Sequence, residues 1–268
     1  MKLRVLIDNN TYIDQYYLGE PALSYYIESG NNRILFDTGY SDAFLFNADK
    51  MGIDLGSLTH IVLSHGHNDH TGGLAYLKER FDLKRVELVA HPGCFGEREA
   101  AEGNIGAPLT KDEMGSLCRM KLCREPVWIG EGCVFLGEIP DRLAFEARKP
   151  IGRRKTGGVW EDDYVMEDSA MAFTTSKGLF VVTGCSHSGI CNIVEQAKAV
   201  CNETQIAGII GGFHLFLVDE RLEDTIRYLG GLNADMLYPC HCVSFDVKAK
   251  MKETLPVSEV GTGLEIEL

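Results

Sequence analysis

Three histidines and one aspartate fall within six consecutive residues, in the order His65, His67, Asp69 and His70. They follow the short apolar strand predicted at 61–63, so a turn can fold them onto one point. Imidazole and carboxylate groups are ligands for zinc, and also for iron or manganese. His65 and His67 alternate along an extended segment, so both can face the same side. Asp69 and His70 follow where the chain turns into a helix, so they can point at a second centre.

The cluster is surrounded by glycines that let the backbone bend closely without Cβ clashes, namely Gly66, Gly72 and Gly73. The alternative interpretation is a polar loop, or an expression tag, in which histidines gather by chance. The internal position, the preceding strand and the glycines all argue against that alternative. We therefore expect a metal site here.

Five segments of the chain resemble one family. HGHNDHTGG at 65–73 resembles the signature of the metallo-β-lactamase fold superfamily, and ILFDTG at 34–39 resembles its upstream aspartate motif. Three later segments are similar to one branch of that superfamily: VTGCSHSGI at 182–190, GGFHL at 211–215 and PCHC at 239–242. That branch contains metal-dependent hydrolases and dihydropterin ribofuranosylaminobenzene 5′-phosphate synthases. The resemblance implies an α/β (α+β layered) fold, an αββα four-layer sandwich with metals at one edge of its two sheets.

By this resemblance, the first two histidines of the cluster bind one metal, and Asp69 and His70 bind the second. Asp69 can also hydrogen-bond a metal-activated hydroxide, which makes it the expected catalytic residue. The superfamily usually adds a third histidine for the first metal, a bridging aspartate after a glycine, and a late histidine for the second metal. His241 matches the late histidine. Asp37 is expected to orient a ligand histidine and not to bind metal itself.

The chain departs from the superfamily pattern at Gly184-Cys185, where the resemblance would place Gly-Asp. His187 lies two residues further on, and we expect it to be a metal ligand. The alternative is that His187 lies beside the cap of the following helix and is bonded to backbone. The identity of the bridge stays open among Cys185, Asp168 and solvent.

The remaining histidines and two cysteines are weighed separately. His214 follows the strand predicted at 206–210 and reaches the same edge, where it could be a ligand, a substrate contact, a proton donor or a core histidine. His60 and His91 are expected to be structural. Residues that flank His241 point away from it because neighbours on a strand face opposite sides. They are therefore expected to pack: Cys240 and Cys242.

Charge limits the partners of this chain. The 268 residues include 26 Lys and Arg and 39 Asp and Glu, which gives a net charge of −13. Such a chain repels phosphate backbones and anionic lipids, so neither a nucleic acid nor a membrane is expected as a partner. No apolar run could span a bilayer, and the N-terminus lacks the features of a signal peptide. We expect a cytoplasmic protein whose nine cysteines are free thiols.

One basic cluster stands out in this acidic chain, around Gly152, and consists of Arg148, Lys149, Arg153, Arg154 and Lys155. Fixed cations attract phosphate groups. The cluster therefore favours a small anionic, phosphorylated substrate held by Arg153, Arg154 and Lys155. The alternative is an ordinary solvated loop.

The apolar periodicity alternates between strands and helices, which favours one domain over 1–268 with sheets inside and helices outside. The stretch at about 92–177 is less regular and is expected to form a lid or insert. Two extended runs around a Gly/Asn turn predict a hairpin at 22–37. Thr110 to Glu113 has the pattern of a helix start with a capping box, and Ser188 can cap a further helix.

These residues predict an enzyme with two divalent transition metals, zinc first and iron or manganese as alternatives. The expected activity is a dinuclear metal-dependent hydrolase that uses a metal-activated hydroxide on a small anionic substrate. Motifs of serine hydrolases and P-loop proteins are absent. Two alternatives remain: a dihydropterin ribofuranosylaminobenzene 5′-phosphate synthase-type transferase, and a non-catalytic metal- or ligand-binding sensor.

Overall fold

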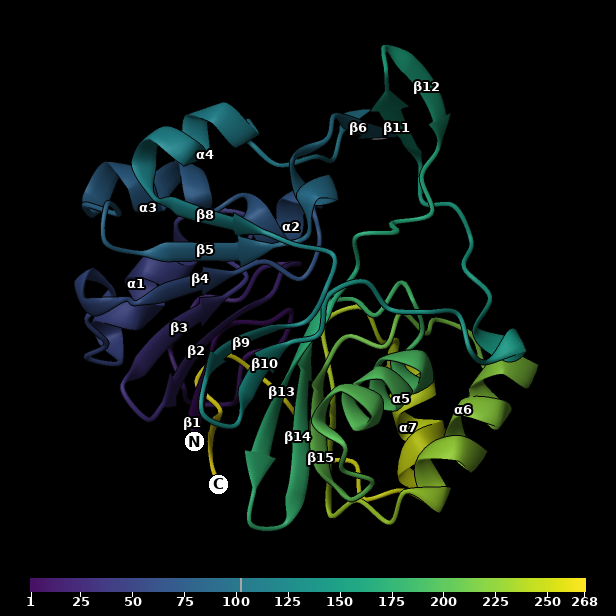
Figure 1. Ribbon diagram of the computed structural model, residues 1–268. Helices are drawn as coiled ribbons and strands as arrows, with labels where there is room; N and C mark the ends of the chain where they lie inside the picture. The colour runs from purple at the N-terminus through teal and green to yellow at the C-terminus, as the bar shows by residue number, and fades with distance from the viewer. Residues whose placement is uncertain (102) are drawn as a thin grey trace.

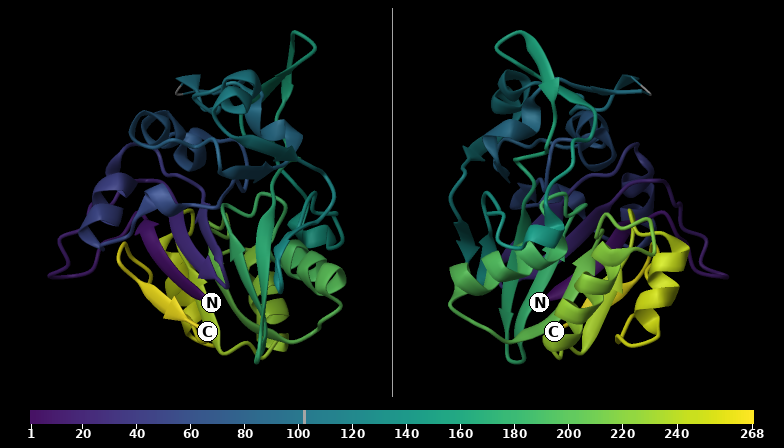
Figure 2. Two further views of the ribbon diagram at one scale, coloured as in Figure 1. Left: turned by 60° about the vertical axis from the view of Figure 1, so that its left-hand side comes forward. Right: turned by 90° about the vertical axis from the view of Figure 1, so that its right-hand side faces the viewer.

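Two large β-sheets lie face to face, with helices on both outer sides, in the computed structural model, which describes residues 1–101 and 103–268 (Figure 1). This is the αββα sandwich that the resemblance implied. The two termini lie side by side, since β1 (Lys2–Ile7) pairs with β17 (Glu265–Glu267) in antiparallel register (Figure 2).

The first sheet has seven strands in the order β17-β1-β2-β3-β4-β5-β8. Besides β17 and β1, its strands are β2 (Ser24–Ser29), β3 (Asn32–Phe36), β4 (His60–Val62), β5 (Glu87–Ala90) and the edge strand β8 (Arg119–Leu122). The predicted hairpin is confirmed, because β2 and β3 pair antiparallel through the turn at 30–31. From β3 to β8 the strands run parallel.

The second sheet has six strands in the order β16-β15-β14-β13-β10-β9. They are β9 (Val127–Gly130), β10 (Cys133–Phe135), β13 (Ala170–Thr175), β14 (Gly178–Thr183), β15 (Ile206–Gly211) and β16 (Met236–Pro239). The last three strands run parallel, joined by crossover helices. Parallel neighbours need such crossovers, so their carboxyl ends meet at one edge of the sheet.

The helices form the outer layers. The first sheet is covered by α1 (Ala43–Lys50), α2 (Asn68–Thr71), α3 (Leu74–Arg80) and α4 (Lys111–Leu117). The second is covered by α5 (Ile190–Cys201), α6 (Glu220–Gly231) and α7 (Phe245–Lys252). Three short 3₁₀ turns complete the elements: η1 (Leu55–Ser57), η2 (Pro92–Phe95) and η3 (Ala144–Glu146). In the described part of the chain, none of the helices has both the length and the apolar character needed to cross a bilayer.

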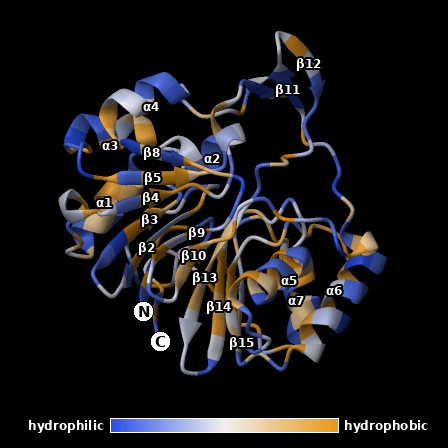
Figure 3. Cartoon of the chain, viewed as in Figure 1, coloured by the Kyte–Doolittle hydropathy of each residue, from blue (hydrophilic) through white to orange (hydrophobic). Residues whose placement is uncertain are grey.

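Alternation along the strands explains the layers. In β14, Phe180 and Val182 join the buried cluster between the sheets, whereas Leu179 and Val181 join the cluster beneath the helices of the second sheet. Side chains of a strand point alternately to its two faces, so a strand buried on both faces is apolar throughout. Figure 3 shows this apolar character along β13, β14 and β15.

The stretch 92–177, predicted to be a lid or insert, contributes strands to all three sheets. Strands β8, β9, β10 and β13 from this stretch complete the two main sheets. Two pieces form a separate sheet in the order β12-β11-β6-β7, with β6 (Arg98–Ala100), β7 (Gly103–Asn104), β11 (Arg153–Thr156) and β12 (Val159–Asp162). The β11–β12 hairpin stands out from the molecule (Figure 1). Short apolar strands are hard to recognise from sequence when they are buried by residues far away in the chain.

Two helix starts can be compared with their patterns. The capping box is confirmed, because the Thr110 hydroxyl accepts a bond from Glu113 N at 3.3 Å and the Glu113 carboxylate accepts one from Thr110 N at 2.7 Å. The cap at Ser188 is wrong. Helix α5 begins after Gly189 without a side-chain cap, and the Ser188 hydroxyl instead donates to Asp168 at 2.5 Å. The first amides of this buried helix end, those of Cys191 and Asn192, instead donate to the Glu146 carboxylate at 3.0 and 2.7 Å.

Candidate metal centre

The candidate ligands come from the carboxyl ends of parallel strands in both sheets. Strand β3 leads into Asp37, and β4 leads into the histidine cluster at 65–70. In the second sheet, β14, β15 and β16 lead respectively into His187, His214 and His241. Open sheets with parallel strands bind ligands at this edge. The face-to-face arrangement therefore brings segments distant in sequence to one point.

The backbone at this point is strained. Among the described residues, eight non-glycine residues have positive φ, and four of them lie at the strand ends around the cluster. They are Asp37 (54°), Ser186 (59°), His214 (49°) and His241 (52°). A left-handed conformation costs a non-glycine residue about 1 kcal/mol or more, and such residues gather at functional sites.

Gly66 is required by close approach. A Cβ built on Gly66 would lie 2.3 Å from the carbonyl oxygen of Cys94 and 2.4 Å from a guanidinium nitrogen of Arg98. That guanidinium is buried between Asp163 and Glu167. Arg98 and its ion pairs therefore pack directly against the loop at 65–67.

One group of three histidines consists of His65, His67 and His187. Nε2 of His65 lies 3.1 Å from Nδ1 of His67, and the ring of His187 lies 4.9 Å from His65 and 5.0 Å from His67. Nε2 of His67 and Nε2 of His187 are buried without a hydrogen-bond partner. Burial lowers the pKa of all three, that of His67 to about 4. Neutral imidazoles with free buried nitrogens fit a bound metal ion.

A second group consists of Asp69, His70 and His241. Oδ2 of Asp69 lies 3.5 Å from Nε2 of His70 and 3.3 Å from Nε2 of His241, and the two Nε2 atoms are 3.2 Å apart. Burial lowers the pKa of His70, but Asp69 and Asp37 outweigh it and raise that pKa to about 10. The two carboxylates that favour the protonated form of His70 would also favour a divalent metal ion at this position.

Cys185 is common to both groups. Its Sγ lies 3.2 Å from Nε2 of His70, and it falls within 4.8 Å of the ligand atoms of His65 and His187 as well as those of the second group. Asp168, the other protein residue considered as a bridge, lies in none of the described ligand groups. Its carboxylate accepts bonds from the backbone and hydroxyl of Ser188 at 2.9 and 2.5 Å. The geometry therefore favours the cysteine as the shared residue.

Polar side chains behind the ligands fix their orientation. Oδ2 of Asp37 lies 2.7 Å from Nδ1 of His70, and the same carboxylate accepts bonds from the backbone and hydroxyl of Ser64. Nδ1 of His241 lies 3.0 Å from Oδ1 of Asn9. Such partners set which ring nitrogen is free to bind a metal. Ser64 and Asn9 were not recognised from the sequence, because single hydroxyl and amide residues carry no spacing signal.

His214 lies against His187, with ring centroids 4.4 Å apart, and its Nδ1 is buried without a partner. It forms a further group with Cys185 and Cys242. Cys240 packs as expected and lies 3.1 Å from the Tyr25 hydroxyl. Cys242 instead reaches the site, because the chain turns at the left-handed His241 and no longer alternates as a strand does.

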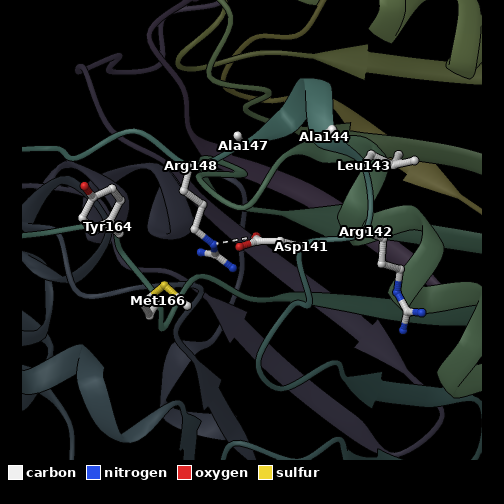
Figure 4. A pocket seen from close by; sticks show the side chains of 8 residues that line it. All are labelled: Asp141, Arg142, Leu143, Ala144, Ala147, Arg148, Tyr164 and Met166. Carbon is white, nitrogen blue, oxygen red and sulfur yellow. Dashed lines mark hydrogen bonds and ion pairs between the residues drawn. The ribbon is translucent and has the colours of Figure 1, made fainter.

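The basic residues at 153–155 are not brought to the histidines. They lie in β11 of the outer hairpin, which is hydrophilic in Figure 3, and each is paired with a carboxylate: Arg153 with Glu99, Arg154 with Glu161 and Lys155 with Glu97. Arg148 faces a separate hollow, where Nε donates to Asp141 at 3.0 Å (Figure 4). Its other nitrogens donate to the carbonyls of Val165 and Ile139.

Two hollows open beside the histidines, and Ile151 lines both of them. The first is lined by His67, Asn68 and Asp69 among others. The second is lined by His187 and His214 together with Lys149, the one member of the basic cluster that reaches the site. A substrate can therefore approach both ligand groups from solvent.

A profile of the metallo-beta-lactamase superfamily matches residues 18–198 of this chain. The chain belongs to the metallo-beta-lactamase superfamily. A 7,8-dihydropterin-6-methyl-4-(beta-D-ribofuranosyl)-aminobenzene-5'-phosphate synthase of Methanocaldococcus jannaschii is 33% identical, over 94% of this chain and 91% of the relative. An uncharacterized protein of the same organism is 30% identical over 94% of both chains.

A solved metallo-beta-lactamase superfamily structure is also similar over the full length. Tm1679, described as a metal-dependent hydrolase of the beta-lactamase superfamily, aligns with 100% of this chain and 99% of its own, with a TM-score of 0.86 at 29% identity. Membership of the metallo-beta-lactamase superfamily implies divalent metal binding, and the buried unpartnered nitrogens of His67 and His187 fit that implication.

Proposed function

We propose that this protein is a dinuclear metal-dependent hydrolase that acts on a small anionic substrate. The observation that carries this proposal is the position of Cys185, whose Sγ is shared by two ligand groups at the edge of the two sheets. One group supplies the imidazoles of His65 and His187, with His67 beside them, and the other supplies Asp69, His70 and His241. Such donor sets suit zinc, and also iron or manganese.

The roles of the residues follow from their positions. Two metals bound at this point would lower the pKa of a water molecule and supply hydroxide at neutral pH. Asp69 lines the open hollow and its carboxylate lies 3.3 Å from His241, so it can orient a water molecule there and accept its proton. Asp37 holds the ring of His70, and Asn9 holds the ring of His241. These partners keep the ligand geometry fixed during the reaction.

A second candidate function is supported by the relative from Methanocaldococcus jannaschii, which is named as a synthase and is 33% identical over most of this chain. In that case the same ligand groups would serve a transferase acting on a dihydropterin substrate. Loss of turnover with retained ligand binding would instead indicate the third possibility, a non-catalytic sensor.

Metal analysis tests the ligand assignment directly. We expect wild-type protein to bind about two metals, His67→Ala to lose most of them, and His187→Ala to retain about one. His60→Ala serves as the matched control, because His60 contacts Thr59 outside the ligand groups. Full metal content in both variants would contradict the site.

Turnover is tested with zinc-, iron- and manganese-loaded protein on phosphomonoesters, phosphodiesters, lactones, thioesters and dihydropterin substrates. Hydrolysis of any ester that is lost in Asp69→Asn supports the hydrolase. Product formation only from a dihydropterin and a phosphoribosyl donor supports the synthase.

A further inference from the structure

The hollow beside His187 contains two cations that have no carboxylate partner. It has a volume of about 200 Å³ and is lined by Lys149 and Arg221 on its polar side. In the part of the chain that the structure describes, neither side chain forms an ion pair, whereas Arg148, Arg153, Arg154 and Lys155 all do. Unpaired cations gathered in a concave site favour an anionic ligand.

The guanidinium group of Arg221 has a buried donor without a hydrogen-bond partner. Arg221 lies in the first turn of α6, its side chain is half-buried, and the unpartnered donor is its Nε. An orphaned guanidinium donor is costly, and a carboxylate or phosphate oxyanion is the group that it binds best. The sequence gives no signal for this residue, because it stands alone among acidic residues at 219–224.

The carboxylates near Arg221 are engaged elsewhere. Asp219 lines the same hollow, but its Oδ1 accepts the bond from Leu222 N that caps α6. Glu146 accepts bonds from the backbone of Cys191 and Asn192 at 3.0 and 2.7 Å. The hollow therefore keeps two cationic side chains against one capping carboxylate.

A histidine connects this hollow to the ligand groups. Nδ1 of His214 is buried without a partner, and its ring lies 4.4 Å from that of His187. An anionic group held by Arg221 would therefore have an acceptor or donor at His214 and the metal ligands beyond it. Both histidines line the same hollow as Lys149 and Arg221.

Phe216 and Leu217 also line the hollow, and with the following Val218 they form an exposed apolar segment. Phe216, Leu217 and Val218 are 52%, 69% and 54% exposed, and Phe216 stands edge-to-face on His214 with ring centroids 4.9 Å apart. The backbone beneath them is fixed, since Leu215 exchanges hydrogen bonds with Cys242 and Ser244. Exposed apolar side chains at the rim of a ligand hollow cover an apolar or aromatic body.

We propose that Arg221 and Lys149 form the anion subsite of the proposed enzyme, and that its substrate joins an oxyanion, phosphate or carboxylate, to an aromatic body resting on Phe216 and Leu217. This inference rests on the proposed function in one respect, which is that the substrate bond to be cleaved lies on the side of His187. The subsite itself depends only on the side chains of the hollow. It replaces the outer hairpin as the place where the substrate charge is bound.

Titration calorimetry with phenyl phosphate, benzoate, inorganic phosphate and neutral phenol tests the subsite, on zinc-loaded and metal-free full-length protein. We expect phenyl phosphate binding to weaken about tenfold in Arg221→Gln and in Lys149→Gln, since each removes a charge-assisted bond. The double variant Arg153→Gln/Arg154→Gln is the matched control and should bind within about twofold of wild type. Whichever of phenyl phosphate and benzoate binds more tightly identifies the oxyanion.

The aromatic wall is tested separately. Phe216→Ser should weaken phenyl phosphate about tenfold and leave inorganic phosphate unchanged, because only the former uses the apolar wall. Binding within twofold of wild type in both Arg221→Gln and Lys149→Gln, in both metal states, would overturn the subsite. So would equal affinity for phenol, or no binding of any probe. Failure of wild type to take up zinc would instead overturn the proposed function, while the metal-free titrations still decide the subsite.

Discussion

Sγ of Cys185 lies 3.2 Å from Nε2 of His70, although 115 residues separate them in the chain. The contact joins the end of β14 to helix α2, and hence the second sheet to the first. The superfamily pattern usually has an aspartate where this thiol stands. A sulfur ligand at the shared position would change the donor set from all nitrogen and oxygen to one that includes a soft ligand.

Cobalt substitution should reveal that sulfur. We expect wild-type protein loaded with Co²⁺ to show a near-ultraviolet sulfur-to-metal charge-transfer band, because a coordinated thiol is deprotonated. The band should disappear in Cys185→Ser and persist in Cys240→Ser, the control cysteine, which packs against Tyr25 outside the ligand groups. A band of full intensity in Cys185→Ser would remove the cysteine from the ligand set. Cys185→Asp should keep the metal and lose the band.

Asp37 should control metal affinity without binding metal. Its carboxylate accepts bonds from His70 and Ser64, all within 2.8 Å. In Asp37→Asn an amide group faces either the histidine or the serine with the wrong polarity, so we expect zinc affinity to fall about 10- to 100-fold. Competition with a chromophoric chelator measures this. Asp54→Asn, at the cap of η1, should match wild type; an equal loss there would point to a general effect on folding.

The buried ion pairs of Arg98 should dominate the stability of the segment behind the metal site. Its guanidinium is 2% exposed and bonds both Asp163 and Glu167. Arg98→Met leaves two buried carboxylates without their cation, so the free energy of unfolding should fall by about 3–5 kcal/mol. Arg154→Met, which breaks an exposed pair with Glu161, should cost less than about 1 kcal/mol. Urea denaturation compares the two, and similar losses would contradict this difference.

His67 should make the metal-free protein sensitive to acid. Burial lowers its pKa from 6.5 to about 4, so the unfolded chain binds a proton that the folded chain refuses. His67 therefore leaves the free energy of unfolding at its full value above pH 6.5 and decreases it as the pH falls toward 4. The decrease between pH 7 and pH 5 is about 2 kcal/mol. His70, whose pKa is raised to about 10, acts in the opposite direction. Urea midpoints measured in chelator for wild type and His67→Asn separate the contribution of His67 from that of His70. Only the variant should lack the loss of stability at acidic pH that His67 causes. Parallel pH profiles for both proteins would refute the assignment.

Local sequence patterns predicted much of the fold and the histidine cluster of the candidate site. The alternating apolar strands, the hairpin at 22–37 and the capping box at Thr110 depend on neighbouring residues, so the sequence predicts them correctly. The histidine cluster at 65–70 is likewise local, because its four side chains follow one strand. The short strands within 92–177 were not recognised, because their partners lie in other parts of the sheets.

By itself, the sequence determined the family, the layered fold and the residue types at the metal site. Only the tertiary structure decided which cations line the hollow beside the histidines. The sequence groups Arg153, Arg154 and Lys155 by proximity along the chain, yet β11 carries them to an outer hairpin and pairs them with carboxylates. Arg221, isolated in sequence, reaches the hollow because α6 follows the parallel strand β15. Charge acts through distance in space, and distance is set by the packing of the two sheets and their crossover helices.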